Sequence, residues 1–209
     1  WDKEGNDAGT FTPKDWSVDV GYARKLTDDL SVGATARFIR SDMSGLDKDD
    51  VANAVAFDLG LYYRRNFENW EQSQWAVGLQ ASNFGTKIDY GYGKYDQASK
   101  VAAGGMIDHV FTDKHRLQGT LDVACQVLPN TNWGGSVGVE YTLLQIVAIR
   151  GGYHYGEQDN KLQRYGTLGF GVGCHHIKED FAYLIPEKDS LLKNTWQVAL
   201  SIDLGLFKR

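Results

Sequence analysis

The chain has 209 residues, of which 42% are hydrophobic and 23% charged, with a formal net charge of -5. No apolar run reaches roughly 18 residues, which excludes a transmembrane helix, and the mild acidity gives no reason to expect nucleic acid as a partner. The 24 glycines, the 12% of aromatic residues and the 3 prolines favour a fold made of many strands.

Residues 1–15 are polar and lack a basic segment followed by an apolar one, so no signal peptide is recognisable. We expect either that such a peptide was cleaved or that the chain begins partway through a longer protein. From residue 16 onward, apolar and polar residues alternate, which predicts about 11 strands. The expected ranges are 16–25, 30–41, 53–65, 75–83, 101–111, 115–127, 134–141, 145–155, 164–175, 180–185 and a closing strand within 193–209.

The closing strand has the clearest alternation, because Trp196, Val198 and Leu200 are separated by small or polar residues. An aromatic residue, Phe207, follows close to the end, which is typical of bacterial outer-membrane barrels. The last strand of a soluble sandwich would show the same alternation, so this strand alone leaves both open.

The connections alternate in length. Short turns are expected at 26–29, 112–114, 142–145 and 176–179, and longer polar loops at 42–52, 84–100, 156–163 and 186–193. The connections 66–74 and 128–133 fit this rhythm less well. Outer-membrane barrels have short periplasmic turns and long outer loops, so the alternation predicts an all-β, transmembrane antiparallel β-barrel with its C-terminus in the periplasm.

An odd number of strands conflicts with the even number found in bacterial single-chain barrels. An unpaired edge in lipid would leave backbone groups without hydrogen bonds. We therefore expect residues 1–209 to be a single barrel domain that lacks its N-terminal strands.

Charged residues of both signs occur on the register opposite the apolar one. We predict that they pair across neighbouring strands and fill the interior, whereas a selective conduit would show one sign or a continuous apolar lining. The predicted network comprises Asp19, Arg37, Asp58, Arg64, Asp108, Arg116, Asp122, Glu140, Arg150 and Asp203.

The outer loops supply the candidate partner-binding surface. Three tyrosines in the loop 84–100 are the kind of aromatic anchor that binding surfaces use, and packing of the loop on itself is the alternative. The candidate residues are Tyr90, Tyr92, Tyr95, Asp47, Lys48 and Lys188.

Nothing in the sequence supports catalysis, and we expect no enzyme activity, no metal site and no cofactor. The adjacent His175 and His176 would point to opposite faces of a strand, and Cys125 and Cys174 lie on strands far apart in order, so neither pair suggests a metal or a disulfide. The GFGVG motif at 169–173 lies inside a strand, where its glycines would allow curvature or close approach of side chains.

Several segments resemble the PorV/PorQ family, and its PorV branch most closely. The most particular points are RKL at 24–26, RFIRSDMS at 37–44, SNFGTKI at 82–88 and AYLIP at 182–186. The similarity extends from about residue 15 to the end, and the chain departs from the family at 129–134, where a longer loop is expected.

These relatives are outer-membrane proteins of the type IX secretion system of Bacteroidetes. The resemblance implies a FadL-like barrel of about 14 strands in the full protein, in the bacterial outer membrane with its loops on the cell surface. It implies a shuttle for protein secretion that receives cargo proteins from a large translocon barrel, recognises their C-terminal signal domain, and passes them to a surface attachment complex with a sortase-like protease. Membrane lipid and lipopolysaccharide would surround it. The alternatives are a FadL-like transporter of hydrophobic small molecules and a soluble, lectin-like sandwich.

Overall fold

The computed structural model describes residues 14–42, 51–70, 72–91, 93–157, 164–174, 177–187 and 194–202. Every regular element in these residues is a β-strand. Among them, no helix has the length and apolar character that a membrane crossing would need.

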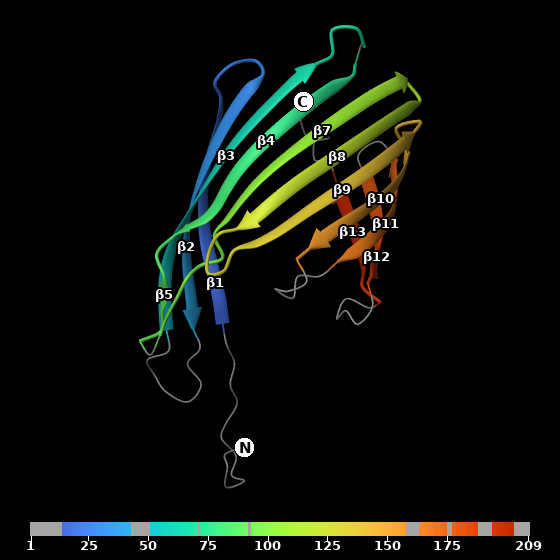
Figure 1. Ribbon diagram of the computed structural model, residues 1–209. Helices are drawn as coiled ribbons and strands as arrows, with labels where there is room; N and C mark the ends of the chain where they lie inside the picture. Colours follow the sequence, from blue (N-terminus) through green and yellow to red (C-terminus); the bar gives the residue numbers. More distant parts are fainter. Residues whose placement is uncertain are drawn as a thin grey trace. The chain divides into compact units, whose positions relative to one another are not determined.

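Eleven strands form one sheet, in which each strand is hydrogen-bonded to the next along the chain (Figure 1). The strands of this sheet are β1 Lys14–Lys25, β2 Leu30–Asp42, β3 Val51–Asn66, β4 Gln74–Gly85, β7 Lys100–Thr112, β8 His115–Gln126, β9 Asn132–Leu143, β10 Val147–Gly156, β11 Tyr165–Cys174, β12 Ile177–Pro186 and β13 Trp196–Ile202. A separate two-stranded sheet pairs β5 Ile88–Asp89 with β6 Lys94–Tyr95. The predicted all-β, antiparallel architecture with its eleven long strands is confirmed.

Three details of the expected elements are wrong. The connection 84–100 contains the hairpin β5–β6, because two-residue strands are too short to produce a periodic signal. The strand expected at 180–185 begins three residues earlier, at Ile177, where it pairs with Cys174 of β11. The strand expected at 145–155 begins at Val147, because Leu144 and Gln145 have φ values of 55° and 58° and form the turn.

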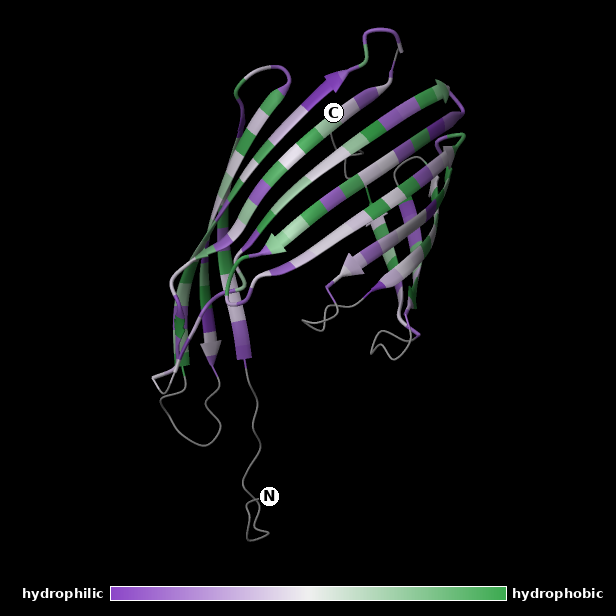
Figure 2. Ribbon diagram, in the orientation of Figure 1, coloured by the Kyte–Doolittle hydropathy of each residue, from purple (hydrophilic) through white to green (hydrophobic). Residues whose placement is uncertain are grey.

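The large apolar side chains of the long strands are exposed. Figure 2 shows hydrophobic and hydrophilic bands alternating along many of the strands. Val20, Leu59 and Leu121 are 71%, 63% and 61% exposed. The buried apolar residues are small, namely Ala52, Ala54, Ala56, Ala76 and Ala148. This distribution is the reverse of a water-soluble sandwich, in which large apolar residues face a shared interior.

The chain divides into two compact units. The first comprises Trp1–Leu61, Leu79–Val101 and Gln126–Thr131, and the second comprises Tyr62–Gly78, Ala102–Cys125 and Asn132–Arg209. The long strands β3, β4, β7 and β8 therefore contribute residues to both, and each unit is described below by itself.

Candidate functional site

In the first unit, charged and amide side chains of β1 to β4 meet around Arg37. The register places Arg37 of β2 directly opposite Asp19 of β1, and the Arg37 Nε donates to both Asp19 carboxylate oxygens at 3.0 Å. Its terminal nitrogens donate to Asp58 on β3 at 3.4 Å and to the Asn83 side-chain oxygen on β4 at 2.7 Å. One guanidinium therefore joins four strands, and we call these four residues the Arg37 cluster.

Asn83 has a second role in this cluster. Its φ of 59° lies in the left-handed region, where asparagine is better tolerated than most residues. In this conformation the Asn83 N–H donates to Asp58 Oδ1 at 2.7 Å. The strained backbone conformation of Asn83 is thus stabilised by two hydrogen bonds, one with Arg37 and one with Asp58.

In the second unit, the carboxylate of Asp108 on β7 is almost completely buried, at 2% exposed. Arg116 of β8 donates to both of its oxygens at 2.6 Å, and Gln74 of β4 donates to Oδ2 at 2.9 Å. Two parallel hydrogen bonds to one carboxylate give a geometrically specific pair. The buried charge is therefore balanced by strands on both sides of β7.

A third cluster surrounds Arg150 on β10. Its Nε pairs with Glu140, which lies directly opposite on β9, and its NH1 donates to Asp180 of β12 at 2.5 Å. Because β11 lies between β10 and β12, Arg150 must cross that strand. A Cβ atom at Gly171 of β11 would collide with Asp180 and contact Arg150 at 3.1 Å, so the glycine provides the space. The predicted use of the GFGVG glycines for close approach of side chains is confirmed at this position.

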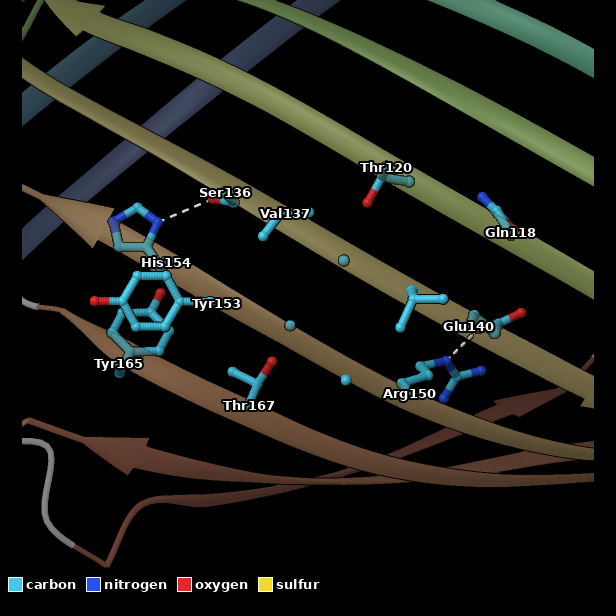
Figure 3. Close-up of a pocket in the computed structure, with 14 residues that line it drawn as sticks. Gln118, Thr120, Ser136, Val137, Glu140, Arg150, Tyr153, His154, Tyr165 and Thr167 are labelled. Carbon is cyan, nitrogen blue, oxygen red and sulfur yellow. Dashed lines mark hydrogen bonds and ion pairs between the residues drawn. The ribbon is translucent and has the colours of Figure 1, made fainter.

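A polar pocket of about 370 Å³ crosses β8 to β11 in the second unit (Figure 3). Its floor is the facing pair Gly138 and Gly152, with Thr120 and Thr167 on the flanking strands. At one end is the ion pair of Arg150 with Glu140, and at the other Ser136 hydrogen-bonds the His154 Nδ1 at 2.9 Å. The His154 ring stacks on Tyr165 with 5.0 Å between centroids.

A larger pocket of about 520 Å³ lies in the same unit, beside the β7–β8 and β9–β10 turns. Its lining includes Asp108, Arg116 and Arg150, whose charges are already paired. The charged groups that line both pockets are therefore largely engaged with one another.

The other residues of the predicted network lie outside these clusters. Arg64 on β3 and Asp122 on β8 are exposed and on the expected register. Asp203 is outside the described residues, as are Asp47, Lys48, Lys188 and Tyr92 of the predicted partner surface.

The described histidines contact neighbouring hydroxyl groups or rings. The His109 Nδ1 is 3.0 Å from the hydroxyl of the buried Ser73 and the His115 Nδ1 is 2.5 Å from that of Tyr141. Within the described ranges, no three His, Cys, Asp or Glu side chains are grouped to hold a metal ion. His175 and His176 lie beyond those ranges, Cys125 is half-buried on β8, and Cys174 is exposed on β11.

Two of the predicted partner-binding tyrosines are described, and both belong to the first unit. The Tyr90 hydroxyl donates to the Ser41 hydroxyl on β2 at 2.8 Å, and its ring contacts that of Tyr95 with 5.9 Å between centroids. Tyr95 is 52% exposed. Tyr90 therefore contributes to packing within the unit, whereas Tyr95 presents half of its surface for contact.

The hairpin that carries Tyr95 has its own polar support. The backbone N–H of Gly91 and the ammonium group of Lys94 hold the pKa of Asp89 below its usual value. A second ion pair joins Lys87 to Asp96 at 3.0 Å. The hairpin is thus cross-linked by two ion pairs, and the lowered pKa keeps Asp89 charged to more acidic pH than an ordinary carboxyl group.

The sequence patterns did not single out the buried polar residues Ser73, Gln97 and Ser99, which are 0%, 8% and 2% exposed. All three lie in or beside connections, where no alternation marks a side chain as buried. The SNFGTKI segment at 82–88 includes Asn83, and its resemblance to the family could have drawn attention to the strained part of β4.

A family model described as type IX secretion system protein PorV matches residues 2–132. The matched range includes the Arg37 cluster, Asp108, Arg116 and the β5–β6 hairpin, whereas the Arg150 cluster lies beyond it. Comparison with curated proteins finds no match.

Proposed function

Because the chain belongs to the PorV family of type IX secretion system proteins, we propose that it is a non-enzymatic, FadL-like β-barrel of the bacterial outer membrane. The observation that carries this proposal is the exposure of the large apolar side chains on one register of the strands. The three arginine-centred clusters occupy the opposite register. A barrel that meets lipid on its outer face and encloses polar side chains would have both the exposed apolar register and the charged register.

Membership in this family implies a part in type IX secretion. We propose that the chain binds translocated cargo proteins through their C-terminal signal domain and shuttles them from the translocon barrel to the surface attachment complex with its sortase-like protease. Such a role needs a binding surface and no reacting group. The paired charges described above fit this requirement, because they cross-link strands.

The recognition surface in this proposal is on the long loops, which face the cell surface while the C-terminus is periplasmic. Tyr95 supports the proposal, since a half-exposed tyrosine on a charge-linked hairpin offers a large contact area with little loss of side-chain entropy. Tyr92, Asp47, Lys48 and Lys188 are further candidates on the same loops.

The proposal predicts that Tyr95→Ala weakens cargo binding. Loss of an aromatic anchor typically costs about 1–2 kcal/mol or more, so we expect at least a fivefold loss of affinity for a purified cargo C-terminal domain. Binding would be measured by surface plasmon resonance on the detergent-solubilised protein.

Lys114→Gln, in the turn between β7 and β8, is the matched control and should leave affinity unchanged. Heat-modifiable migration on gels would show that both variants retain the barrel. Equal affinity of Tyr95→Ala and Lys114→Gln would remove Tyr95 from the recognition surface.

A further inference from the structure

The connection between β4 and β7, residues 86–99, lies on the charged face of β2 and β3, and we call it the strap. Tyr90 of the strap reaches Ser41 on β2. Ser41 is four residues from Arg37 on the same strand and therefore faces the same side of the sheet. The strap thus occupies the face that carries the Arg37 cluster, opposite the exposed Leu59.

Buried side chains fasten the strap to β3 and β4. The Gln97 amide donates to the backbone oxygens of Val55 and Thr86 at 3.0 and 2.6 Å, and the Ser99 hydroxyl donates to the Asn83 oxygen at 2.7 Å. Thr86 also exchanges hydrogen bonds with Val55, since its N–H donates to the Val55 oxygen at 2.9 Å and its hydroxyl accepts from the Val55 N–H at 3.0 Å.

The chain enters the strap in close contact with β3, at Gly85, the last residue of β4. A Cβ atom at Gly85 would overlap the Val55 carbonyl and come within 2.8 Å of the Ala56 Cα. Ala52, Ala54 and Ala56, on the register of Asp58, are only 1%, 2% and 0% exposed. Small residues on this strip of β3 therefore leave room for a covering segment, and Tyr90 places the strap on the same face.

We propose that the strap is a fixed constriction on the inner side of the barrel wall at its cell-surface end, where Tyr95 stays accessible, so that the interior does not serve as a path for solutes. This inference rests on the proposed barrel, because only there is the charged face an interior. It goes beyond the shuttle role, since a cargo carrier could in principle also conduct. It also separates the protein from a FadL-like transporter, which needs an open route.

Solute uptake into vesicles tests the proposal. The full-length protein, reconstituted in phosphatidylcholine vesicles, should give arabinose-driven swelling no faster than protein-free vesicles. Replacement of residues 87–96 by Gly-Gly should raise the swelling rate about tenfold or more, because the covering segment is removed. Swelling of the unaltered protein at the rate of the shortened variant would overturn the proposal, and so would a folded shortened variant that gives no swelling.

A single substitution keeps the test valid if the shortened variant fails to fold. Gln97→Glu preserves shape but replaces the donating amide by a carboxylate facing two carbonyl oxygens, which should release the strap. Lys94→Gln is the control, since it removes only an exposed ion pair with Asp89.

Cysteine labelling reports the release directly. In a background with Cys125 and Cys174 replaced by serine, Ala54→Cys should react with a water-soluble maleimide about tenfold more slowly than Lys94→Cys, because Ala54 lies beneath the strap. Gln97→Glu should remove most of this protection. Equal labelling of the two cysteines with the native strap would overturn the proposal.

These readouts do not use cargo, so a failure of cargo recognition leaves them unaffected. Heat-modifiable migration, measured on each variant, reports the barrel itself. Its absence in the unaltered protein would contradict the proposed function, whereas its presence together with rapid labelling of Ala54→Cys would contradict only the constriction.

Discussion

Arg37 joins β1, β3 and β4 to its own strand through a single guanidinium group. Replacing it by methionine keeps much of the side-chain volume but leaves Asp19 and Asp58 without the cation that they share. Asp58 is only 17% exposed, so its charge is poorly compensated by solvent. We expect Arg37→Met to lower the free energy of unfolding by about 2 kcal/mol, measured by urea unfolding in lipid vesicles.

Arg64→Met is the matched control for this prediction. Arg64 is exposed on the same register and lies outside the Arg37 cluster, so its replacement should change stability by less than about 0.5 kcal/mol. Equal effects of the two substitutions would show that the cluster does not stabilise the fold.

At the scale of one element, the packing across β11 depends on the absence of a side chain at Gly171. Gly171→Ala would force apart the Arg150–Asp180 pair that crosses this strand. We expect a loss of about 1–3 kcal/mol in the same unfolding assay, from overpacking and weakened charged hydrogen bonds.

Gly60→Ala provides the comparison for Gly171→Ala, because a Cβ atom there meets nothing within 4 Å. It should be neutral or slightly stabilising, since alanine restricts the unfolded chain. A stability loss for Gly171→Ala no larger than that for Gly60→Ala would mean that Arg150 can pair with Asp180 without the space that Gly171 provides.

The elements that sequence could predict are those with a local signal. Period-two alternation, as in Phe57, Asp58 and Leu59, marks both the strand and the side of each residue, and the long strands followed it. The strap has no such signal. The Gln97 amide donates to the carbonyl of Val55, 42 residues away. The burial of Gln97 therefore depends on a long-range contact, which the sequence around Gln97 does not indicate.

The candidate site was predictable to the same extent. Arg37 and Asp19, or Arg150 and Glu140, lie on adjacent strands of a hairpin, so alternation places them on one face and the turn places them opposite each other. The contact of Arg150 with Asp180 crosses an intervening strand and was outside that reasoning. The proposal of Tyr90 for partner binding depends on its residue type and its place in a long loop, which do not distinguish a contact with Ser41 from a contact with another protein.

For the whole molecule, the decisive question is which solvent meets the exposed apolar register. Leu59 is 63% exposed, and in water its replacement by arginine would be harmless. In a bilayer the same change should cost about 2–4 kcal/mol near the midplane. We therefore expect Leu59→Arg to destabilise the protein by that amount when folding is measured in lipid vesicles.

Gln80→Arg tests the other face. Gln80 lies on β4 on the register of Gln74 and is exposed, so an added charge there remains in a polar environment and should cost less than about 1 kcal/mol. A Leu59→Arg protein as stable as Gln80→Arg would contradict the membrane assignment.

The reversed distribution of large and small apolar residues also bears on how this chain reaches its native state. In the strands that the structure describes, the bulky hydrocarbon groups are exposed and the buried apolar residues are alanines, so water alone offers these strands no large apolar core around which to collapse. In the proposed outer-membrane barrel, folding would therefore be driven by an acyl environment that solvates those groups, and before insertion the polypeptide would depend on being kept apart from its own copies.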